Sequence, residues 1–360
     1  MSVSVFEHPL LSGLLGDDEV SAYFSASADI GAMLRFEAAL AAAEAAEGVI
    51  PARAAEKIGA ACDALEPDFG RLKQSTQRDG VCVPELVRQL RAALDAEISA
   101  HVHFGATSQD VIDTALVLRL KDALRILAAR LDALDDNLAD LADRFGENPL
   151  MAHTRMQRAL PIRVADKVTA WRRPLSELGA RLAETGGRLL RLQLGGPVGT
   201  LEALGDKGQA VADRLAADLG LSSDGCWHTD RQALVELAGW FSQVSGALGK
   251  IGSDVALLAQ NEVGAIRLAG GGTSSAMAHK QNPVAAETLV TLARFNATLV
   301  SGMHHALVHE NERSGSAWTL EWMLLPQMAV AVGAGLNTAL RLTGAVEAFG
   351  DPGGDGQVQR

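Results

Sequence analysis

The chain has 360 residues, of which 48% are hydrophobic and only 4% aromatic, and its formal net charge is -12 at pH 7. This length is enough for one large domain or several smaller ones, each with its own hydrophobic core. The excess of acidic residues argues against nucleic acid or an anionic membrane as a partner, because both attract clustered Lys and Arg.

The three cysteines, Cys62, Cys82 and Cys226, lie far apart in the sequence and form no CxxC motif. Neither a disulfide framework nor a metal site is indicated, and no phosphate-binding glycine loop is found, so we expect no metal and no cofactor. The N-terminal segment lacks the features of a signal peptide, and no run of about 18 apolar residues occurs. These features predict a cytoplasmic protein with no membrane partner.

The beginning of the chain predicts a small domain of short helices, at residues 1–100. Its Ala-rich segment from Met33 to Ala46 is typical of a helix, and Gly48 and Pro51 mark the end of that helix. Ala and Leu dominate the whole composition, whereas β-branched residues are sparse, which favours helix. We therefore expect an all-α fold.

Three long stretches of the central region carry apolar residues at alternating spacings of three and four, which is the pattern of one helix face. They run from Leu116 to Phe145, from Val168 to Leu192 and from Leu234 to Leu258. A helix of about 30 residues is about 45 Å long, so these helices should pack lengthwise in an extended bundle. Bundles of this length usually share their core with other subunits.

Glycine and proline interrupt the pattern at residues 146–149, 195–197, 221–225 and 270–272, where we expect loops. We assign residues 101–335 to the central long-helix domain. Residues 336–360 are expected to form one more short helix and a tail, DPGGDGQVQR, whose composition is typical of a frayed end.

The segment Gly270–Pro283, GGGTSSAMAHKQNP, combines glycines, hydroxyls, a lysine and an amide ahead of a helix that should begin near Pro283. It is either a solvated surface loop or a mobile loop that carries chemistry. In the second interpretation Ser274 is an acid or base, and the charge of Lys280 favours a serine alkoxide or a substrate carboxylate. The residue types alone leave both interpretations open.

The run SSAMAHKQNP resembles the signature of the fumarase/aspartase superfamily, whose usual form is GSSxMPxKxNP. Thr273 stands where a glycine is usual, and Ala278 where a proline is usual. The resemblance implies these site residues: Ser274 and Lys280 as catalytic, Ser275 and Asn282 as substrate-binding.

A second block, HFGATSQDVIDT at residues 103–114, resembles the substrate-binding block of the same superfamily. The resemblance implies that His103, Thr107, Ser108 and Gln109 contact the substrate. Taken alone, the segment also fits a capping motif that opens a helix through Thr107, Ser108 or Asp110.

A third block, HTRMQRALPI from residue 153, lies where the superfamily has a Thr-His pair followed by Gln, Ala and Pro. Thr154 and Gln157 match the substrate-binding positions, but Arg155 replaces the histidine. A guanidinium stays charged at neutral pH and is a poor proton donor, so it suits a leaving group that is already a stable anion. His153 either takes over the catalytic role of the missing histidine or is structural.

A carboxylate leaving group favours the 3-carboxy-cis,cis-muconate cycloisomerase branch of the superfamily. Its members add a substrate carboxylate across a conjugated double bond to form a γ-lactone, in the protocatechuate branch of the β-ketoadipate pathway. The stretch HENERSGSAWTLEWMLLP, from residue 309, resembles this branch. Arg313 is then expected to bind the third carboxylate of a small tricarboxylate substrate, the alternative being an ordinary surface arginine.

Two alternatives remain. The first is another β-elimination lyase, adenylosuccinate lyase above all, which would require the histidine that Arg155 replaces. The second is a non-catalytic crystallin-like protein, which would have no need to keep Ser274, Lys280 and Asn282 together. The resemblance also implies a homotetramer that shares active sites between subunits around a common bundle. Many members have a third helical domain of about 100 residues where this sequence has a short tail.

Overall fold

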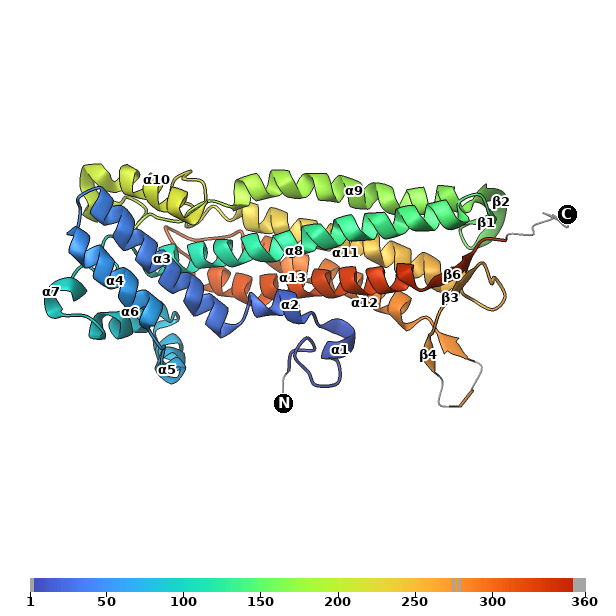
Figure 1. The fold of residues 1–360 in the computed structure, drawn as a ribbon, viewed down its shortest axis with the longest axis horizontal. Coiled ribbons are helices and arrows are strands. Elements are labelled where there is room, and N and C mark those ends of the chain that lie inside the picture. Colours follow the sequence, from blue (N-terminus) through green and yellow to red (C-terminus); the bar gives the residue numbers. More distant parts are fainter. Residues whose placement is uncertain (1–2, 274–275, 278–279, 352–360) are drawn as a thin grey trace.

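The computed structural model describes residues 3–273, 276–277 and 280–351, and its main feature is an extended bundle of long helices (Figure 1). The long helices are α8 (Ser108–Phe145), α9 (Val164–Leu189), α11 (Gln232–Leu258), α12 (Val284–His305) and α13 (Gly315–Gly344). The first and third apolar stretches coincide with α8 and α11, and the second with α9, which ends three residues before Leu192. The predicted all-α bundle is therefore confirmed.

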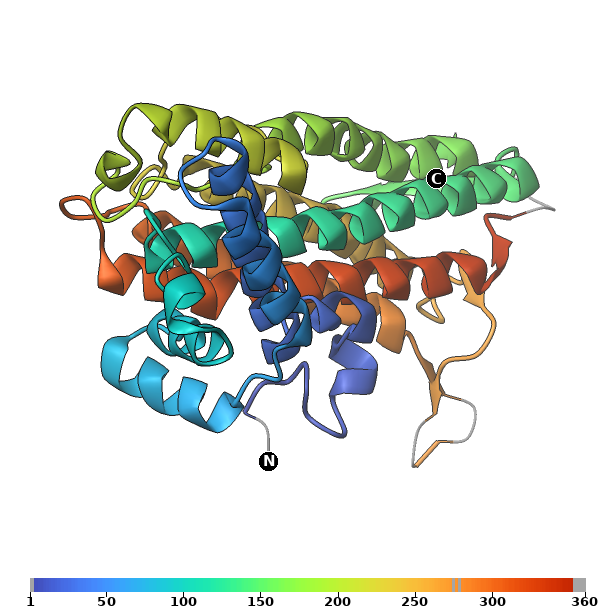
Figure 2. The same ribbon diagram turned by 60° about the vertical axis from the view of Figure 1, so that its left-hand side comes forward.

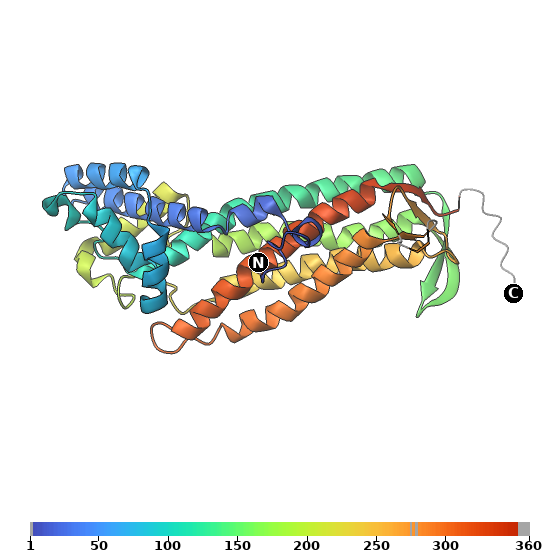
Figure 3. The same cartoon turned by 90° about the horizontal axis from the view of Figure 1, so that it is seen from below.

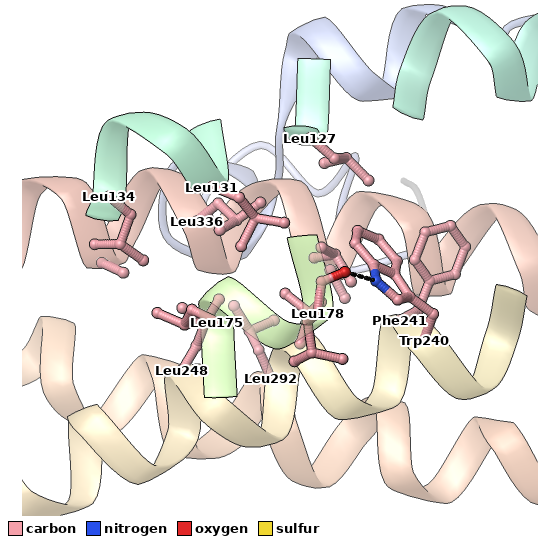
Figure 4. Close-up of a cluster of buried hydrophobic side chains, with 14 of the residues drawn as sticks. Leu127, Leu131, Leu134, Leu175, Leu178, Trp240, Phe241, Leu248, Leu292 and Leu336 are labelled. Atoms are coloured by element: carbon pink, nitrogen blue, oxygen red, sulfur yellow. Dashed lines mark hydrogen bonds between the residues drawn. The ribbon is translucent and has the colours of Figure 1, made fainter. Parts of the chain in front are cut away.

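The bundle core consists mainly of leucines that repeat along one face of each helix. Leu127, Leu131 and Leu134 of α8 meet leucines of α9, α11, α12 and α13 (Figure 4). Trp240 of α11 is buried there, and its indole N–H donates to the backbone carbonyl of Leu178 at 2.8 Å. Aligned stripes of this length explain why the helices run side by side rather than crossing.

A layer of helices covers the end of the bundle at which α8 begins (Figures 1 and 2). It comprises α3 (Ala26–Ala46), α4 (Ala52–Ala64), α5 (Phe69–Asp79), α6 (Val83–Ala92) and α7 (Ala96–Ser99), whereas α1 (Ser12–Leu15) and α2 (Asp18–Ala22) lie along the bundle against α13. The helix expected up to Ala46 is α3, and Gly48 follows it at φ +68°, a left-handed conformation that glycine adopts without strain. The 3₁₀ helix η1 (Glu202–Lys207) leads into α10 (Gly208–Leu219), which packs against α3.

Three small antiparallel sheets, which the sequence did not predict, lie at the opposite end (Figure 3). They pair β1 (Pro149–Thr154) with β2 (Gln157–Arg163), β3 (Ile266–Leu268) with β6 (Val346–Phe349), and β4 (Gly272–Thr273) with β5 (Gln281–Asn282). The β1–β2 turn is made by Arg155 and Met156, both with positive φ, so it lacks the glycine that usually reveals a hairpin.

The end of the chain differs from the short helix expected after residue 335. α13 runs without a break from Gly315 to Gly344, so that boundary falls inside a bundle helix, and β6 follows it. By length and composition α13 is also the one described helix that qualifies as a membrane span, but 67% of its most apolar window is buried in the protein, as in a core helix. Residues 352–360, where the tail was expected, lie outside the described residues.

Candidate active site

The block at residues 103–114 forms the start of α8. Thr107 is the N-cap residue, and its backbone N–H donates to the Asp110 carboxylate at 3.0 Å. Asp110 also accepts from the backbone N–H groups of Gly195 and Gly196 at 3.0 and 2.9 Å, and so it fixes the glycine loop that precedes Pro197. The capping interpretation is thus correct for Thr107 and Asp110. Thr107 and Ser108 remain half-buried beside this loop.

Gln109 and Arg313 are 204 residues apart in the sequence, and the fold brings them together. The Arg313 Nε–H donates to Gln109 Oε1 at 2.7 Å. Gln109 is fully buried, whereas Arg313 is half-buried and also donates to the carbonyl oxygen of Pro197 at 3.3 Å. The two predicted substrate-binding residues therefore belong to one cluster, and Arg313 is not an isolated surface arginine.

His103, the remaining predicted residue of this block, contacts the layer of helices that includes α3. Its Nδ1 lies 2.6 Å from Oε1 of Glu37, which is buried on α3. Burial alone would lower the pKa of His103, but the Glu37 carboxylate outweighs it and the pKa is raised. This arrangement favours a charged imidazole that ties the block to α3.

The block beginning at His153 forms the β1–β2 hairpin beyond the far end of α8. Thr154 pairs with Gln157, and Arg155 lies in the turn between them. The hairpin is largely exposed, and in the described part of the chain Arg155 has no hydrogen bond or ion pair. His153 is also exposed, with Nδ1 3.1 Å from the carbonyl oxygen of Met151.

The two ends of the signature segment pair as β4 and β5, which lie between α11 and α12 in the chain (Figure 1). Lys280 and Asn282 line a cavity of about 750 Å³ beside the end of α11, and Pro283 caps α12, where the sequence predicted a helix to begin. Ser274 and Ser275 lie outside the described residues.

The structure places the three blocks at two ends of one chain. Between the block at Thr107 and the hairpin at Arg155 lies all of α8, whose 38 residues span about 57 Å. The β4–β5 hairpin is likewise separated from His228, beside the first block, by the 27 residues of α11, about 40 Å. A single copy therefore does not bring the first block into contact with the other two.

Several buried polar residues beside the first block were missed by the sequence analysis. They are Asp113, His228, Arg231 and Glu321. Asp113 lies in the block at residues 103–114, and Glu321 lies in the stretch that begins at residue 309. Each is a charged residue at an apolar position of a helix, a pattern that could have predicted a buried charge. Arg231 precedes α11 and gave no signal, because an arginine after a polar loop is ordinarily exposed.

The bundle of long helices, with the signature segment between α11 and α12, has the architecture of a helical lyase. Residues 16–298 match the family model described as "Lyase", and the chain belongs to this family, which confirms the fumarase/aspartase prediction.

Among individual proteins, the chain is 42% identical to the 3-carboxy-cis,cis-muconate cycloisomerase of Pseudomonas aeruginosa, a match that covers 91% of this chain and 72% of that protein. It is 40% identical to the protein of the same name in Bradyrhizobium diazoefficiens, covering 91% and 74%. The crystal structure of 3-carboxy-cis,cis-muconate lactonizing enzyme from Pseudomonas putida superposes with a TM-score of 0.89 at 38% identity, covering 94% of this chain and 77% of that one.

Proposed function

We propose that this protein is a 3-carboxy-cis,cis-muconate cycloisomerase, which converts its substrate to a carboxymuconolactone. The observation that carries the proposal is that relatives with this activity in their names match more than nine-tenths of the chain. The replacement of the usual histidine by Arg155 supports it, because lactonisation uses a carboxylate and not an amine or hydroxide. Adenylosuccinate lyase and other β-elimination lyases, the alternatives, have less support.

The chemistry requires no base to create the nucleophile, because a carboxylate is already ionised near pH 7. One substrate carboxylate adds to the conjugated double bond, and the electron pair of that bond moves onto the adjacent carbon as an enolate-like anion. We assign the proton that this carbon takes up to Ser274. Lys280 and Asn282 would stabilise the negative charge as it develops.

The remaining residues would bind the other carboxylates. Arg313, held by Gln109, offers a guanidinium at one end of the bundle. Thr107 and Ser108, which precede Gln109 in the sequence, add two hydroxyls. Arg155, Thr154, Gln157 and Ser275 would complete the site, and either Arg155 or His153 would act in place of the histidine that is usual in the superfamily. The reaction is expected to need no cofactor.

A complete site would need several copies of the chain, because about 57 Å separate its blocks within one copy. We propose a homotetramer in which the first block of one subunit meets hairpins of others. The exposed apolar side chains of the β1–β2 hairpin, Met156 at 75% and Leu160 at 73% exposure, support burial of that hairpin against a partner. The other partner would be a small tricarboxylate, in the cytoplasm.

The test is to mix purified protein with 3-carboxy-cis,cis-muconate without metal or cofactor, and to follow loss of the diene absorbance while NMR identifies the product. Conversion to a carboxymuconolactone supports the proposal, and the same reaction in deuterated water reveals the face of proton addition. Absence of conversion, with fumarate released from adenylosuccinate instead, would assign the protein to the rival lyase.

A further inference from the structure

Behind Gln109 lies a group of charged side chains that are fully buried. Arg231 donates through Nη1 and Nη2 to the two carboxylate oxygens of Asp113, at 2.6 and 3.0 Å. Its Nε and Nη2 donate to the carboxylate of Glu321 at 2.9 and 2.5 Å. All three side chains are 0% exposed. They come from α8, from the N-cap of α11 and from α13, so the group joins three helices at the end of the bundle that carries the first block.

Burying the three charged side chains of Arg231, Asp113 and Glu321 costs desolvation free energy. One guanidinium faces two carboxylates away from water, and Glu321 also lies 3.7 Å from Nε2 of the buried His309 side chain. Buried ion pairs recover their desolvation cost only when the geometry is close to ideal, and apolar side chains of similar volume are often as stable. Stability alone therefore does not account for the buried charges, and their contacts indicate a functional role.

Besides Trp318, whose indole N–H donates to Asp113 at 2.9 Å, and His309, the group contacts Gln109, which belongs to the first block. The Gln109 Nε2 donates to the Asp113 carboxylate at 3.1 Å and to the backbone carbonyl oxygen of His228 at 2.9 Å. A carboxylate and a carbonyl can only accept, so both N–H bonds of the amide are committed to this side. The amide oxygen must then face the other way, which is where the Nε–H of Arg313 donates to it.

The contact with Gln109 sets the direction of the Arg313 guanidinium, which is planar and rigid. Nε donates to Gln109, and Nη2 donates to Pro197. The N–H groups of Nη1 have no hydrogen bond in the described part of the chain. Together with the second N–H of Nη2 they remain for a carboxylate, and a guanidinium fixed in this way binds one with a defined orientation.

We infer that Asp113, supported by Arg231 and Glu321, is a positioning residue that aims Arg313 at a substrate carboxylate through the amide of Gln109. The inference rests on the proposed function in taking a tricarboxylate as the ligand. Arg313 would hold a carboxylate that does not react, so its contact is equally strong in the substrate and in the transition state. Loss of such a contact raises KM and leaves kcat nearly unchanged.

A double-mutant cycle tests this. Asp113→Asn, Arg313→Ala and the double variant are compared with the wild type, both by kinetics with 3-carboxy-cis,cis-muconate and by calorimetric binding of propane-1,2,3-tricarboxylate. We expect Asp113→Asn to raise KM and Kd about tenfold, with kcat within about threefold of the wild type. In the Arg313→Ala background the same substitution should change KM and Kd by less than about twofold, because its target is gone.

The control is Ser245→Ala, which removes a buried hydroxyl that accepts from Asn296 in the bundle without contact to Gln109. It should leave KM unchanged. If Asp113→Asn does not assemble, Glu321→Gln is put through the same cycle, since it keeps the Asp113–Arg231 contact, and it should give coupling of the same sign but smaller size.

The outcomes separate the two proposals. Equal effects of Asp113→Asn in both backgrounds, with a wild type that turns over, would make Asp113 merely structural and overturn the inference alone. Coupling in tricarboxylate binding, with a wild type that does not convert 3-carboxymuconate, would support the inference and contradict the proposed function. A wild type that neither binds tricarboxylate nor turns over would overturn both.

Discussion

The two ends of the bundle are built differently. At the end where α8 begins, Asp110, Gln109 and Arg313 are held by hydrogen bonds from several segments of the same chain. At the other end, Arg155 lies in an exposed hairpin turn without a partner in the described part of the chain, and Lys280 is exposed on a second hairpin. One half of the proposed site is thus organised within the chain, and we propose that a partner copy holds the other half in place.

The largest effect is expected at the hairpin end, from Ser274→Ala. Removing the proposed proton donor should lower turnover about 10³-fold or more. The oligomer and its thermal unfolding should stay as in the wild type, because the substitution removes only one hydroxyl group. Steady-state kinetics and light scattering provide the measurement, and near-normal turnover would refute the assignment of the proton to this serine.

The opposite pattern is expected at the buried end, from Asp110→Asn. The carboxylate of Asp110 accepts hydrogen bonds from Gly195, Gly196, Thr107 and His228, and an amide cannot accept all of them. The free energy of unfolding should fall by about 3 kcal/mol, as when one partner of a buried ion pair is removed. Urea unfolding at pH 6.5 is the measurement, and an unchanged midpoint would show that Asp110 does not organise this end.

The contact between His228 and Asp110 predicts that stability depends on pH. Burial alone would lower the pKa of His228, but hydrogen bonds to Asp110 and Cys226 outweigh it and raise the pKa to about 9 from an ordinary value of 6.5. Since the folded state holds the proton more tightly, the stabilisation is complete below pH 6.5 and is lost as the pH rises through about 9. The urea midpoint should fall over this window, and His228→Gln should abolish that part of the decline. An identical pH profile in the variant would contradict the prediction.

The smallest effect is expected from Arg155→His, which restores the histidine that is usual in the superfamily. We expect lactonisation to fall about tenfold, because a partly neutral imidazole stabilises the carboxylate less well than a guanidinium. Thermal stability should not change, and Arg158→His on the neighbouring strand is the matched control. Undiminished lactonisation by Arg155→His would remove the argument that links this arginine to a carboxylate leaving group.

The same contrast explains what the sequence could predict. Leucine stripes repeat over many turns, so α8, α9 and α11 were predictable, as was the start of α12 near Pro283. The β1–β2 hairpin was not, because Arg155 and Met156 take left-handed conformations without a glycine to signal them. The burial of Arg231 could not be predicted for another reason. It depends on Asp113 and Glu321, which are 118 and 90 residues away in the chain.

The central claim is that each active site combines the first block of one subunit with the hairpins of others, and mixing two impaired variants tests it most directly. Ser274→Ala and Arg313→Ala proteins would be unfolded together in equal amounts and refolded. They would be assayed against each variant refolded alone, with 3-carboxy-cis,cis-muconate well below KM, where the raised KM of Arg313→Ala leaves it only weakly active. Random assortment should leave about a quarter of the sites with both blocks intact, so activity should return to about a quarter of that of refolded wild type. Mixed oligomers no more active than the separate variants would place both residues in one chain's site and contradict the account.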